Sequence, residues 1–381
     1  MRVVICANTA WNLHNFRAGL IRALIARGME VVAVAPPDSK HGPMLESLGC
    51  RFVPLPMDSK GTSPLGDLRL LLGFLGIFRR LKPDCFLGYT IKPNIYGSFA
   101  ARVLGICVIN NVSGLGTAFV SESWLTRVAR SLYRLALSRS KVVFFQNRDD
   151  LDLFVESGLV RSEQVRLLPG SGIDLQRFAP VAIGRREAEG PVFLLIARLL
   201  WDKGVGEYVE AARRVKARLP SARFQLLGFL DVENRSAVNR DAVEAWVAEG
   251  LVEYLGRTDD VRPFIAGADC VVLPSYYREG VPHSLLEAAA MARPIITTDW
   301  IGCREVVDDG VSGYLCAVRD PASLATAVLR FIELPLRERL AMGAAGRAKM
   351  EREFDEKFVI DAYLEAIIAG RHWSNSTDHT N

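Results

Sequence analysis

Short apolar runs rich in β-branched residues alternate with longer helical patterns along the whole chain of 381 residues. In the first half the runs lie at 3–7, 31–35, 52–55, 85–88, 108–111, 142–146 and 166–168, and in the second half at 192–197, 224–227, 253–255, 270–273, 295–298 and 313–317. Strands that are apolar throughout and separated by helices are typical of parallel sheets covered on both faces. The same series occurs twice, so the sequence predicts an α/β fold of two doubly wound domains in tandem.

The length of the chain also favours two domains of ordinary size. We expect a first domain over residues 1–170 and a second over 191–355. A linker is expected over 171–190, because this stretch begins with turn residues and continues as a polar segment without periodicity. A last helix is expected over 356–370, and the polar tail 371–381 is expected to be disordered.

Charge is distributed unevenly between the two halves. Residues 1–170 contain 21 Lys and Arg against 12 Asp and Glu, whereas the remaining residues contain 26 against 31. A basic first domain predicts a polyanionic partner, which could be a membrane surface, a diphosphate or a nucleic acid. Few aromatic residues interleave with the basic ones and no nucleic-acid-binding motif occurs, so a nucleic acid is not expected.

The sequence predicts a cytoplasmic protein without a membrane-spanning helix or a metal site. Its longest apolar run, 70–78, is too short to cross a bilayer. The N-terminus has the pattern of a first strand, not of a signal peptide. The seven cysteines show no C-x-x-C spacing, which suits a reducing cytosol and not a structural zinc site.

The most specific segment is 279–287, in which Glu279 and Glu287 stand eight positions apart. A buried strand is expected before it and a helix after it, opening at Pro282. Backbone amides at the start of a helix favour an anion. Carboxylates beside such a site can accept hydrogen bonds from hydroxyl groups. A site for both phosphate and hydroxyls suits a nucleotide-sugar.

Two cations are predicted to reach the same place. In the usual strand order of a doubly wound sheet, the first and fourth strands flank the point where the winding reverses. Arg198 and Lys203 follow the first strand of the second half, and Glu279 follows the fourth. An isolated Arg-x-x-x-x-Lys is usually a solvated helix start, and paired glutamates often only cap a helix. Together these features predict a diphosphate site that needs no metal.

Arg198, Lys203, the Glu279-x7-Glu287 motif and the tandem β/α halves resemble the retaining glycosyltransferases of family 4, which have the GT-B fold. The resemblance covers nearly the whole chain. It implies two Rossmann-like domains facing a cleft, with the C-terminal helix crossing back to the first domain. It also implies that Arg198 and Lys203 hold the donor diphosphate, that Glu279 acts at the sugar hydroxyls, and that Glu287 binds the ribose.

The resemblance implies further donor contacts, with His283 as a neighbour of the phosphates and not a catalyst. The phosphate cradle would be completed by the backbone around Gly280, Val281, Pro282 and His283. The base would lie near Gly256 and Arg257, at the end of the third strand of the second half.

The first half carries less specific candidates for the acceptor side. They follow the first, fourth and fifth strands, and they are Asn15, Arg17, Lys92, Asn94, Ser113, Gly114 and Gly116. The segments after the fourth and fifth strands resemble the branch of the family that extends sugars on undecaprenyl diphosphate. A plain βα turn explains the glycines almost as well. Asn15 and Arg17 could also merely cap a helix that starts near Phe16.

One helical pattern places Arg127, Arg130 and Arg134 on one face, beside an apolar stripe that begins at Trp124. A basic amphipathic helix can lie at an anionic membrane surface. An ordinary domain helix with a solvated basic face fits the periodicity equally well. The basic first domain favours peripheral association with the inner face of the cell membrane. The apolar run 70–78, which arginines follow, is a second candidate.

The resemblance implies transfer of a hexose from a UDP-sugar, with retained anomeric configuration, to a lipid-linked polyprenyl-diphosphate saccharide in surface polysaccharide or glycan assembly. An N-acetylhexosamine is the favoured sugar. No cofactor is expected, and the absence of a D-x-D motif favours metal independence. Two alternatives stay open: a UDP-N-acetylglucosamine 2-epimerase, which needs no acceptor, and a catalytically silent GT-B binding subunit.

Overall fold

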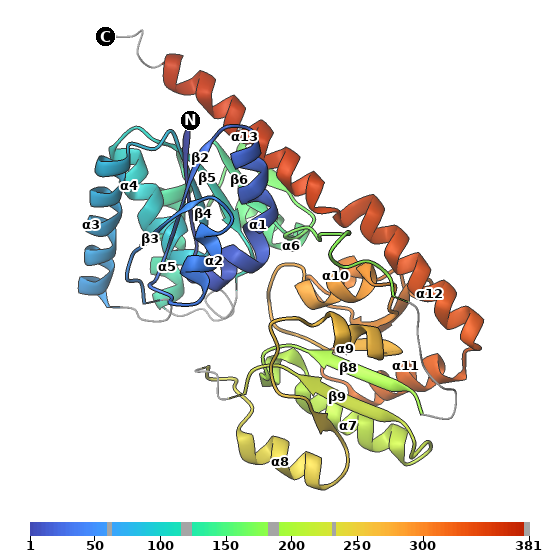
Figure 1. Cartoon of the computed structure of the whole chain (residues 1–381). Coiled ribbons are helices and arrows are strands. Elements are labelled where there is room, and N and C mark those ends of the chain that lie inside the picture. Colours follow the sequence, from blue (N-terminus) through green and yellow to red (C-terminus); the bar gives the residue numbers. More distant parts are fainter. Residues whose placement is uncertain (59–62, 116–123, 182–189, 231–233, 377–381) are drawn as a thin grey trace. The chain divides into compact units, whose positions relative to one another are not determined.

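The computed structural model describes residues 1–58, 63–115, 124–181, 190–230 and 234–376, with the backbone alone at 124–126 and 371–376. The chain forms two compact units (Figure 1). The first consists of Met1–Ser171 together with Glu356–Asn381, and the second of Gly172–Asp355.

The first unit is built on a seven-stranded parallel sheet in the order β3-β2-β1-β4-β5-β6-β7. Its strands are β1 (Arg2–Cys6), β2 (Glu30–Ala35), β3 (Arg51–Pro54), β4 (Cys85–Tyr89), β5 (Cys107–Val112), β6 (Val142–Phe145) and β7 (Val165–Leu167). Its helices are α1 (Ala10–Ala26), α2 (His41–Glu46), α3 (Pro64–Leu81), the π-helical turn η1 (Pro93–Gly97), α4 (Ser98–Val103), α5 (Trp124–Leu137), α6 (Arg148–Glu156) and α13 (Glu356–Ser376).

Side chains of this sheet alternate between its two faces, as the pleat of a strand requires. Val3 and Ile5 of β1 pack with residues of α1 and α13, while Val4 and Cys6 pack with residues of α3 and α4. The sheet is therefore buried on both sides, which explains why its strands are apolar throughout.

The second unit is built on a six-stranded parallel sheet in the order β10-β9-β8-β11-β12-β13. Its strands are β8 (Val192–Ile196), β9 (Arg223–Leu227), β10 (Glu253–Tyr254), β11 (Cys270–Leu273), β12 (Ile295–Thr298) and β13 (Gly313–Cys316). Its helices are α7 (Val205–Lys216), α8 (Arg240–Ala248), α9 (Arg262–Gly267), α10 (His283–Ala290), α11 (Pro321–Glu333) and α12 (Leu336–Lys349).

The predicted fold class is confirmed. All thirteen expected strands are present, and in each sheet the order reverses where the first strand of the unit pairs with the fourth. The C-terminal helix α13 belongs to the first unit, where it lies against α1 and β5 (Figure 1). Among the described residues, no helix is both long enough and apolar enough to cross a membrane.

Two expected boundaries need correction. The stretch expected as a linker packs in part into the second unit, because Ile173 and Phe178 are buried in its core. The tail expected from residue 371 is helical as far as Ser376. No proline follows Gly370 to remove a backbone donor, so the helical hydrogen-bond ladder continues past the glycine.

Candidate active site

The carboxyl edge of the second sheet brings the predicted donor residues together. Arg198 follows β8 and Glu279 follows β11, and these two strands pair directly, with Cys270 opposite Phe193. A reversal of strand order at this place opens the space above the strand ends to a ligand. Arg198, Lys203 and Glu279 therefore lie at the same edge of the second sheet, as predicted from the strand order.

Lys203 and Glu279 form an ion pair between the lysine ammonium and the Oε1 oxygen of the carboxylate. The Lys203 side chain is only 8% exposed to solvent, whereas the Glu279 side chain is 24% exposed. A nearly buried ammonium needs a counter-charge, because the low dielectric of the interior penalises an isolated ion. The pair therefore fixes the lysine at the carboxyl edge of β8.

Tyr277 is a member of this cluster that the sequence interpretation missed. The Lys203 ammonium nitrogen lies 5.3 Å from the centroid of the Tyr277 ring, and the Arg198 guanidinium carbon lies 6.0 Å from it. An aromatic face attracts cations through its quadrupole. The signal that could have found it is an aromatic residue two positions before the glutamate of the motif.

The turn that carries Lys203 is fixed to the loop after β11 through the backbone. The Tyr276 amide donates to the Asp202 carbonyl at 2.9 Å. Gly204, which follows Lys203, has φ +76°, and a methyl group there would overlap the carbonyl oxygen of Pro274. Only glycine allows this conformation and this close approach together. Local backbone geometry thus holds the cation beside the glutamate.

Helix α10 begins one residue later than expected, at His283, because Pro282 is its N-cap. A proline nitrogen carries no hydrogen, so the first helical amides that can meet an anion are those of His283 and Ser284. Gly280, Val281 and Pro282 are buried. The His283 Nδ1 atom lies 2.9 Å from Glu287 Oε1, one helical turn later, and both side chains are largely buried.

Gly302, which was not among the predicted residues, packs against the backbone of the 279–287 motif. Its φ is +83°, and a methyl group there would overlap the carbonyl oxygen of Gly280 and crowd that of Glu279. The chain after β12 therefore packs directly on the backbone of the motif. Burial raises the pKa of the neighbouring Cys303 to about 12, so its thiol stays protonated.

The predicted base side lies at the ends of β9 and β10. Gly256 has φ +74°, and its carbonyl accepts from the Gly228 amide at 2.8 Å. The Arg257 guanidinium carbon lies 5.8 Å from the ring centroid of Phe229, which is exposed. Phe229 was not among the predicted residues. Its carbonyl accepts from the Leu199 amide at 3.0 Å, which ties this pair to the segment after β8.

In the first unit, the structure corrects the interpretation of Asn15 and Arg17. Helix α1 begins at Ala10, where Thr9 Oγ1 accepts from the Asn12 amide at 3.1 Å. Both residues lie inside this helix and cap nothing. Asn15 donates to the Trp11 carbonyl one turn earlier. Arg17 is buried, with its guanidinium carbon 4.3 Å from the ring centroid of Tyr89.

Asn94 is corrected as well, because its side chain is fully buried. It donates to the Asn111 carbonyl at 2.8 Å and accepts from Asn110 at 3.0 Å. Asn111 in turn donates to the Tyr363 hydroxyl of α13 at 3.0 Å and accepts from Ser113 Oγ at 2.8 Å. Asn94 and Asn111 therefore support the loops after β4 and β5, and Ser113 is the part of this network that reaches the surface.

Lys92 and Gly114, two of the remaining acceptor candidates, lie at the carboxyl edge of the first sheet. Lys92 forms an ion pair with Asp67 of α3 at 2.7 Å. Gly114 has φ +122°, a conformation that suits glycine. Gly116 lies outside the described residues.

The structure shows which side chains of the two candidate membrane helices, α5 and α3, are exposed. On α5, Arg127 and Arg134 are exposed and Arg130 is half-buried, while the side chain of Trp124 lies outside the described residues. On α3, the run 70–78 is wrong as a continuous lipid-facing stripe, because Leu72 is exposed but most of the large apolar side chains are not. Four of its apolar side chains, Leu70, Phe74, Ile77 and Phe78, are buried in the core against the sheet.

Among the side chains described, no group of three or more His, Cys, Asp or Glu residues is arranged to hold a metal ion. Arg198, Lys203, Glu279 and Glu287 supply two cations and two carboxylates to the candidate donor site. Cations of this kind suit phosphate oxygens, and carboxylates can accept hydrogen bonds from hydroxyl groups.

Two family profiles match the two halves of the chain. The profile described as a glycosyl transferase 4-like domain matches residues 14–170, and that described as glycosyl transferases group 1 matches residues 190–333. In fold, the chain is similar to Anabaena HepE in complex with UDP, with a TM-score of 0.80, 17% identity, and coverage of 97% of this chain and 100% of that one.

Two curated relatives are similar over most of their length. The Campylobacter jejuni N,N'-diacetylbacillosaminyl-diphospho-undecaprenol alpha-1,3-N-acetylgalactosaminyltransferase is 28% identical, over 96% of this chain and 98% of the relative. The Escherichia coli UDP-Gal:alpha-D-GlcNAc-diphosphoundecaprenol alpha-1,3-galactosyltransferase is 25% identical, over 76% of this chain and 78% of the relative. With both halves matched and the GT-B fold present, the chain belongs to the group 1 glycosyltransferases with a family 4-like first domain.

Proposed function

We propose that this glycosyltransferase moves a hexose from a UDP-sugar to a hydroxyl of a polyprenyl-diphosphate-linked saccharide, with retention of anomeric configuration. An N-acetylhexosamine is the proposed sugar. The observation that carries the proposal is the cluster of Arg198, Lys203, Tyr277 and Glu279 at the reversal of the second sheet. It combines cations for a diphosphate with a carboxylate for sugar hydroxyls.

The acceptor class is supported by the names of two relatives. Both names describe a sugar linked through a diphosphate to undecaprenol, and both give an alpha linkage in the product. One name also gives UDP-Gal as the donor. Since the sugar of UDP-galactose is itself α-linked, an α product means retention in that enzyme. We extend the acceptor class and the stereochemistry to this chain.

In the proposed reaction the acceptor hydroxyl attacks the anomeric carbon from the face that the diphosphate leaves. The new bond joins the acceptor oxygen to the anomeric carbon, and the bond from that carbon to the UDP oxygen breaks. The acceptor proton passes to a phosphate oxygen of the departing UDP. Lys203, Arg198 and the amides at the start of α10 stabilise the charge that develops on the diphosphate. This chemistry requires neither a cofactor nor a metal.

Glu279 has two possible partners in this scheme. It now pairs with Lys203, and a bound diphosphate competes for the same ammonium. Displaced from the lysine, the carboxylate can accept hydrogen bonds from the hydroxyls of the sugar. Glu287 would hold the ribose hydroxyls, and Phe229 with Arg257 would lie against the base.

We place the enzyme at the cytoplasmic face of the membrane that holds its lipid-linked acceptor, bound peripherally. The support is the excess of Lys and Arg in the first 170 residues and the exposed Arg127 and Arg134 of α5.

A panel of UDP-sugars against short-chain polyprenyl-diphosphate saccharides tests the function, with product mass and linkage determined. One UDP-sugar should yield a product one hexose heavier, with an α linkage. Interconversion of UDP-sugars without any acceptor would instead identify an epimerase. Binding of UDP without transfer across the whole panel would identify a silent subunit.

A further inference from the structure

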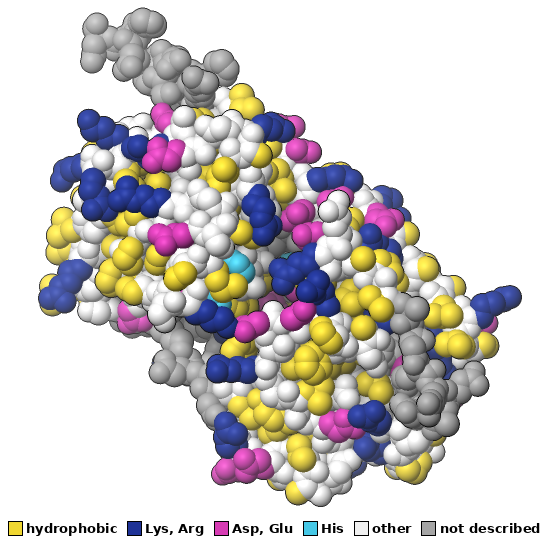
Figure 2. Space-filling model, in the orientation of Figure 1, with side chains coloured by type: hydrophobic (Ala, Val, Ile, Leu, Met, Phe, Trp, Pro, Cys, Tyr) yellow, Lys and Arg dark blue, Asp and Glu magenta, His cyan; other side chains and the backbone are white. Residues whose placement is uncertain are grey.

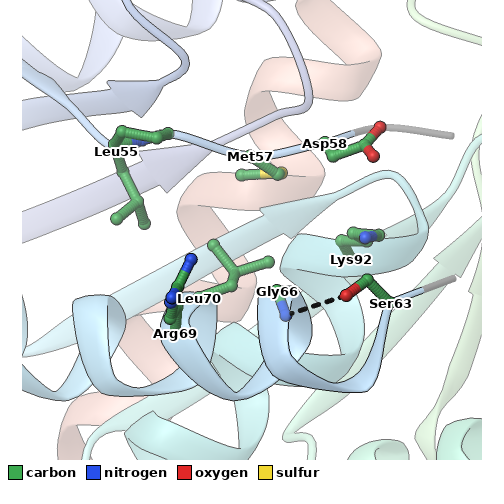
Figure 3. A pocket seen from close by; sticks show the side chains of 9 residues that line it. Leu55, Met57, Asp58, Ser63, Gly66, Arg69, Leu70 and Lys92 are labelled. Carbon is green, nitrogen blue, oxygen red and sulfur yellow. Dashed lines mark hydrogen bonds between the residues drawn. The ribbon is translucent and has the colours of Figure 1, made fainter. Parts of the chain in front are cut away.

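A pocket of about 390 Å³ opens at the carboxyl edge of the first sheet, where the chain passes from β3 into α3 (Figure 3). Leu55, Met57 and Leu70 give it an apolar wall. Arg69 and Lys92 are the cations that line it. Of these residues, only Lys92 is among the acceptor candidates predicted from the sequence.

Lys92 is held in place on the wall of this pocket. Its ammonium lies 2.7 Å from Asp67 Oδ1, and both side chains are largely buried. Asp67 also accepts from the Tyr96 hydroxyl, and this bond adds to the effect of burial in raising the pKa of Tyr96. Thr90, two residues before Lys92, has φ +64°, which is strained for a β-branched residue. Strain of this kind persists only where the surrounding structure holds the backbone in place.

Charges of both signs line the pocket. Arg69 and Lys92 offer donors that suit phosphate oxygens, while Asp58 offers acceptor oxygens that suit sugar hydroxyls. Figure 3 shows Lys92 close to Asp58 and Ser63, with Arg69 and Leu70 farther along α3. A ligand with a phosphate, a sugar and an apolar chain would find a matching group for each part: cations for the phosphate, a carboxylate for the sugar hydroxyls, and apolar side chains for the chain.

An exposed leucine face begins at the same end of α3. Leu65, Leu68 and Leu72 are 70%, 51% and 57% exposed. Their spacing of three and four places them on one side of the helix, opposite the core residues. We call these three residues the leucine face. Lone exposed leucines are ordinary, but three aligned on one helix form a patch that favours an apolar partner.

The helix that carries the leucine face is basic. Helix α3 contains Arg69, Arg79 and Arg80 but only one acidic residue, Asp67. In Figure 2, apolar and basic side chains gather over α3 at the left edge of the molecule. Leucines among arginines complement an anionic bilayer, whose apolar layer lies beneath negative headgroups.

We propose that the leucine face inserts into an anionic membrane and that the adjoining pocket receives the phosphate-sugar end of the lipid-linked acceptor. Arg69 and Lys92 contact the phosphates, and the acceptor's apolar chain leaves the pocket along the leucine face. The proposal rests on the proposed function for the class of acceptor. Beyond that function, the proposal names the residues that bind the acceptor and the surface that inserts into the membrane.

The membrane part is tested with vesicles of phosphatidylglycerol and phosphatidylcholine at low salt. The triple variant Leu65→Ser, Leu68→Ser, Leu72→Ser should lower co-sedimentation about tenfold or more. The matched control is Leu336→Ser with Leu340→Ser on α12, because these leucines are 51% and 48% exposed. The control should bind vesicles as the unmodified chain does. Equal binding by the triple variant would overturn the leucine face as the docking surface.

The pocket is tested with a short-chain polyprenyl-diphospho-N-acetylhexosamine in detergent. Arg69→Gln and Lys92→Gln should each raise the acceptor KM about tenfold, with UDP affinity unchanged. The control Arg148→Gln, on the exposed part of α6, should leave the acceptor KM unchanged. An unchanged acceptor KM in both pocket variants would overturn the pocket.

The two tests separate this proposal from the proposed function. If the unmodified chain transfers sugar to no polyprenyl acceptor, the proposed function fails and the pocket assignment fails with it. The vesicle assay still decides the membrane part in that case, because it needs no transfer. If transfer occurs but neither set of variants responds, only the inference drawn from α3 fails.

Discussion

Lys203 and Glu279 stand 76 positions apart in the chain and form an ion pair at the carboxyl edge of the second sheet. The lysine is the cation expected to hold the donor diphosphate, and the glutamate is the carboxylate expected beside the transferred sugar. Because each is the present partner of the other, a diphosphate must compete with Glu279 for Lys203. This competition gives the two side chains different mutational signatures.

Glu279→Gln should separate binding from turnover. The neutral amide no longer competes for Lys203 and no longer repels phosphate, so UDP should bind more tightly by about 0.5–1 kcal/mol. Turnover should fall about tenfold or more, because the acceptor of the sugar hydroxyls is weakened. Calorimetric titration with UDP and initial rates of transfer measure the two effects. Normal turnover would refute the role assigned to Glu279.

Lys203→Ala should weaken UDP binding and turnover about tenfold or more each. It should also destabilise the second unit by about 1–2 kcal/mol. Breaking a fully buried ion pair would cost more, but Glu279 stays partly solvated.

Arg198→Ala should weaken UDP binding without that loss of stability, since Arg198 is exposed. Urea unfolding and UDP titration distinguish the two variants. Full stability of Lys203→Ala would argue against a structural role for the pair.

Gly302→Ala should impair donor binding through the backbone of the motif. The new methyl group would overlap the Gly280 carbonyl, and the positive φ costs about 1 kcal/mol in addition. Gly310→Ala is the matched control, since Gly310 has φ +74° but its methyl group would meet no atom within 4 Å. UDP affinity should fall in the first variant only. Equal affinities would mean that the packing of Gly302 does not shape the site.

Phe229→Leu tests the proposed contact with the base. Loss of the ring face beside Arg257 should weaken UDP binding by about 1 kcal/mol. Phe358→Leu on α13 is the control, because both phenylalanines are 38% exposed. Titration with UDP compares them. A base that lies elsewhere would leave the affinity of Phe229→Leu unchanged.

Tyr363→Phe tests the network that joins α13 to the loop after β5. The change leaves the buried Asn111 amide without its hydroxyl acceptor and should destabilise the chain by about 1–2 kcal/mol. UDP affinity should not change, because the network lies in the first unit. Denaturant unfolding is the measurement. Unchanged stability would show that Asn111 finds another acceptor.

The positions of the strands and their order could be predicted from local sequence patterns. Every strand lies within a few residues of its expected position, since an apolar run between helical patterns has few other solutions in an α/β fold. Arg198, Lys203 and Glu279 were predicted to meet because strand order in a doubly wound sheet is predictable. Element boundaries were less accurate, as the starts of α1 and α10 show.

Burial decided which predicted residues remain available to a ligand. Asn94 follows a strand, as a ligand-binding residue does, yet it is buried in η1 against β5, where it satisfies the polar groups of Asn110 and Asn111. On α3, Leu70, Phe74, Ile77 and Phe78 of the run 70–78 turned inward, whereas Leu72 of the same run faced out together with Leu65 and Leu68. Periodicity identifies two faces of a helix but does not say which of them the sheet covers.

The sequence by itself determined the two tandem sheets, the order of their strands, and the pairing of cations with the two-glutamate motif. These follow from local periodicity and from residue chemistry at fixed spacings. Only the tertiary structure decided that Lys203 is neutralised by Glu279, that Tyr277 and Gly302 belong to the site, and that an exposed leucine face adjoins a pocket at Lys92. Such relationships depend on which distant segments cover a side chain, and that packing is fixed only when the whole chain has folded.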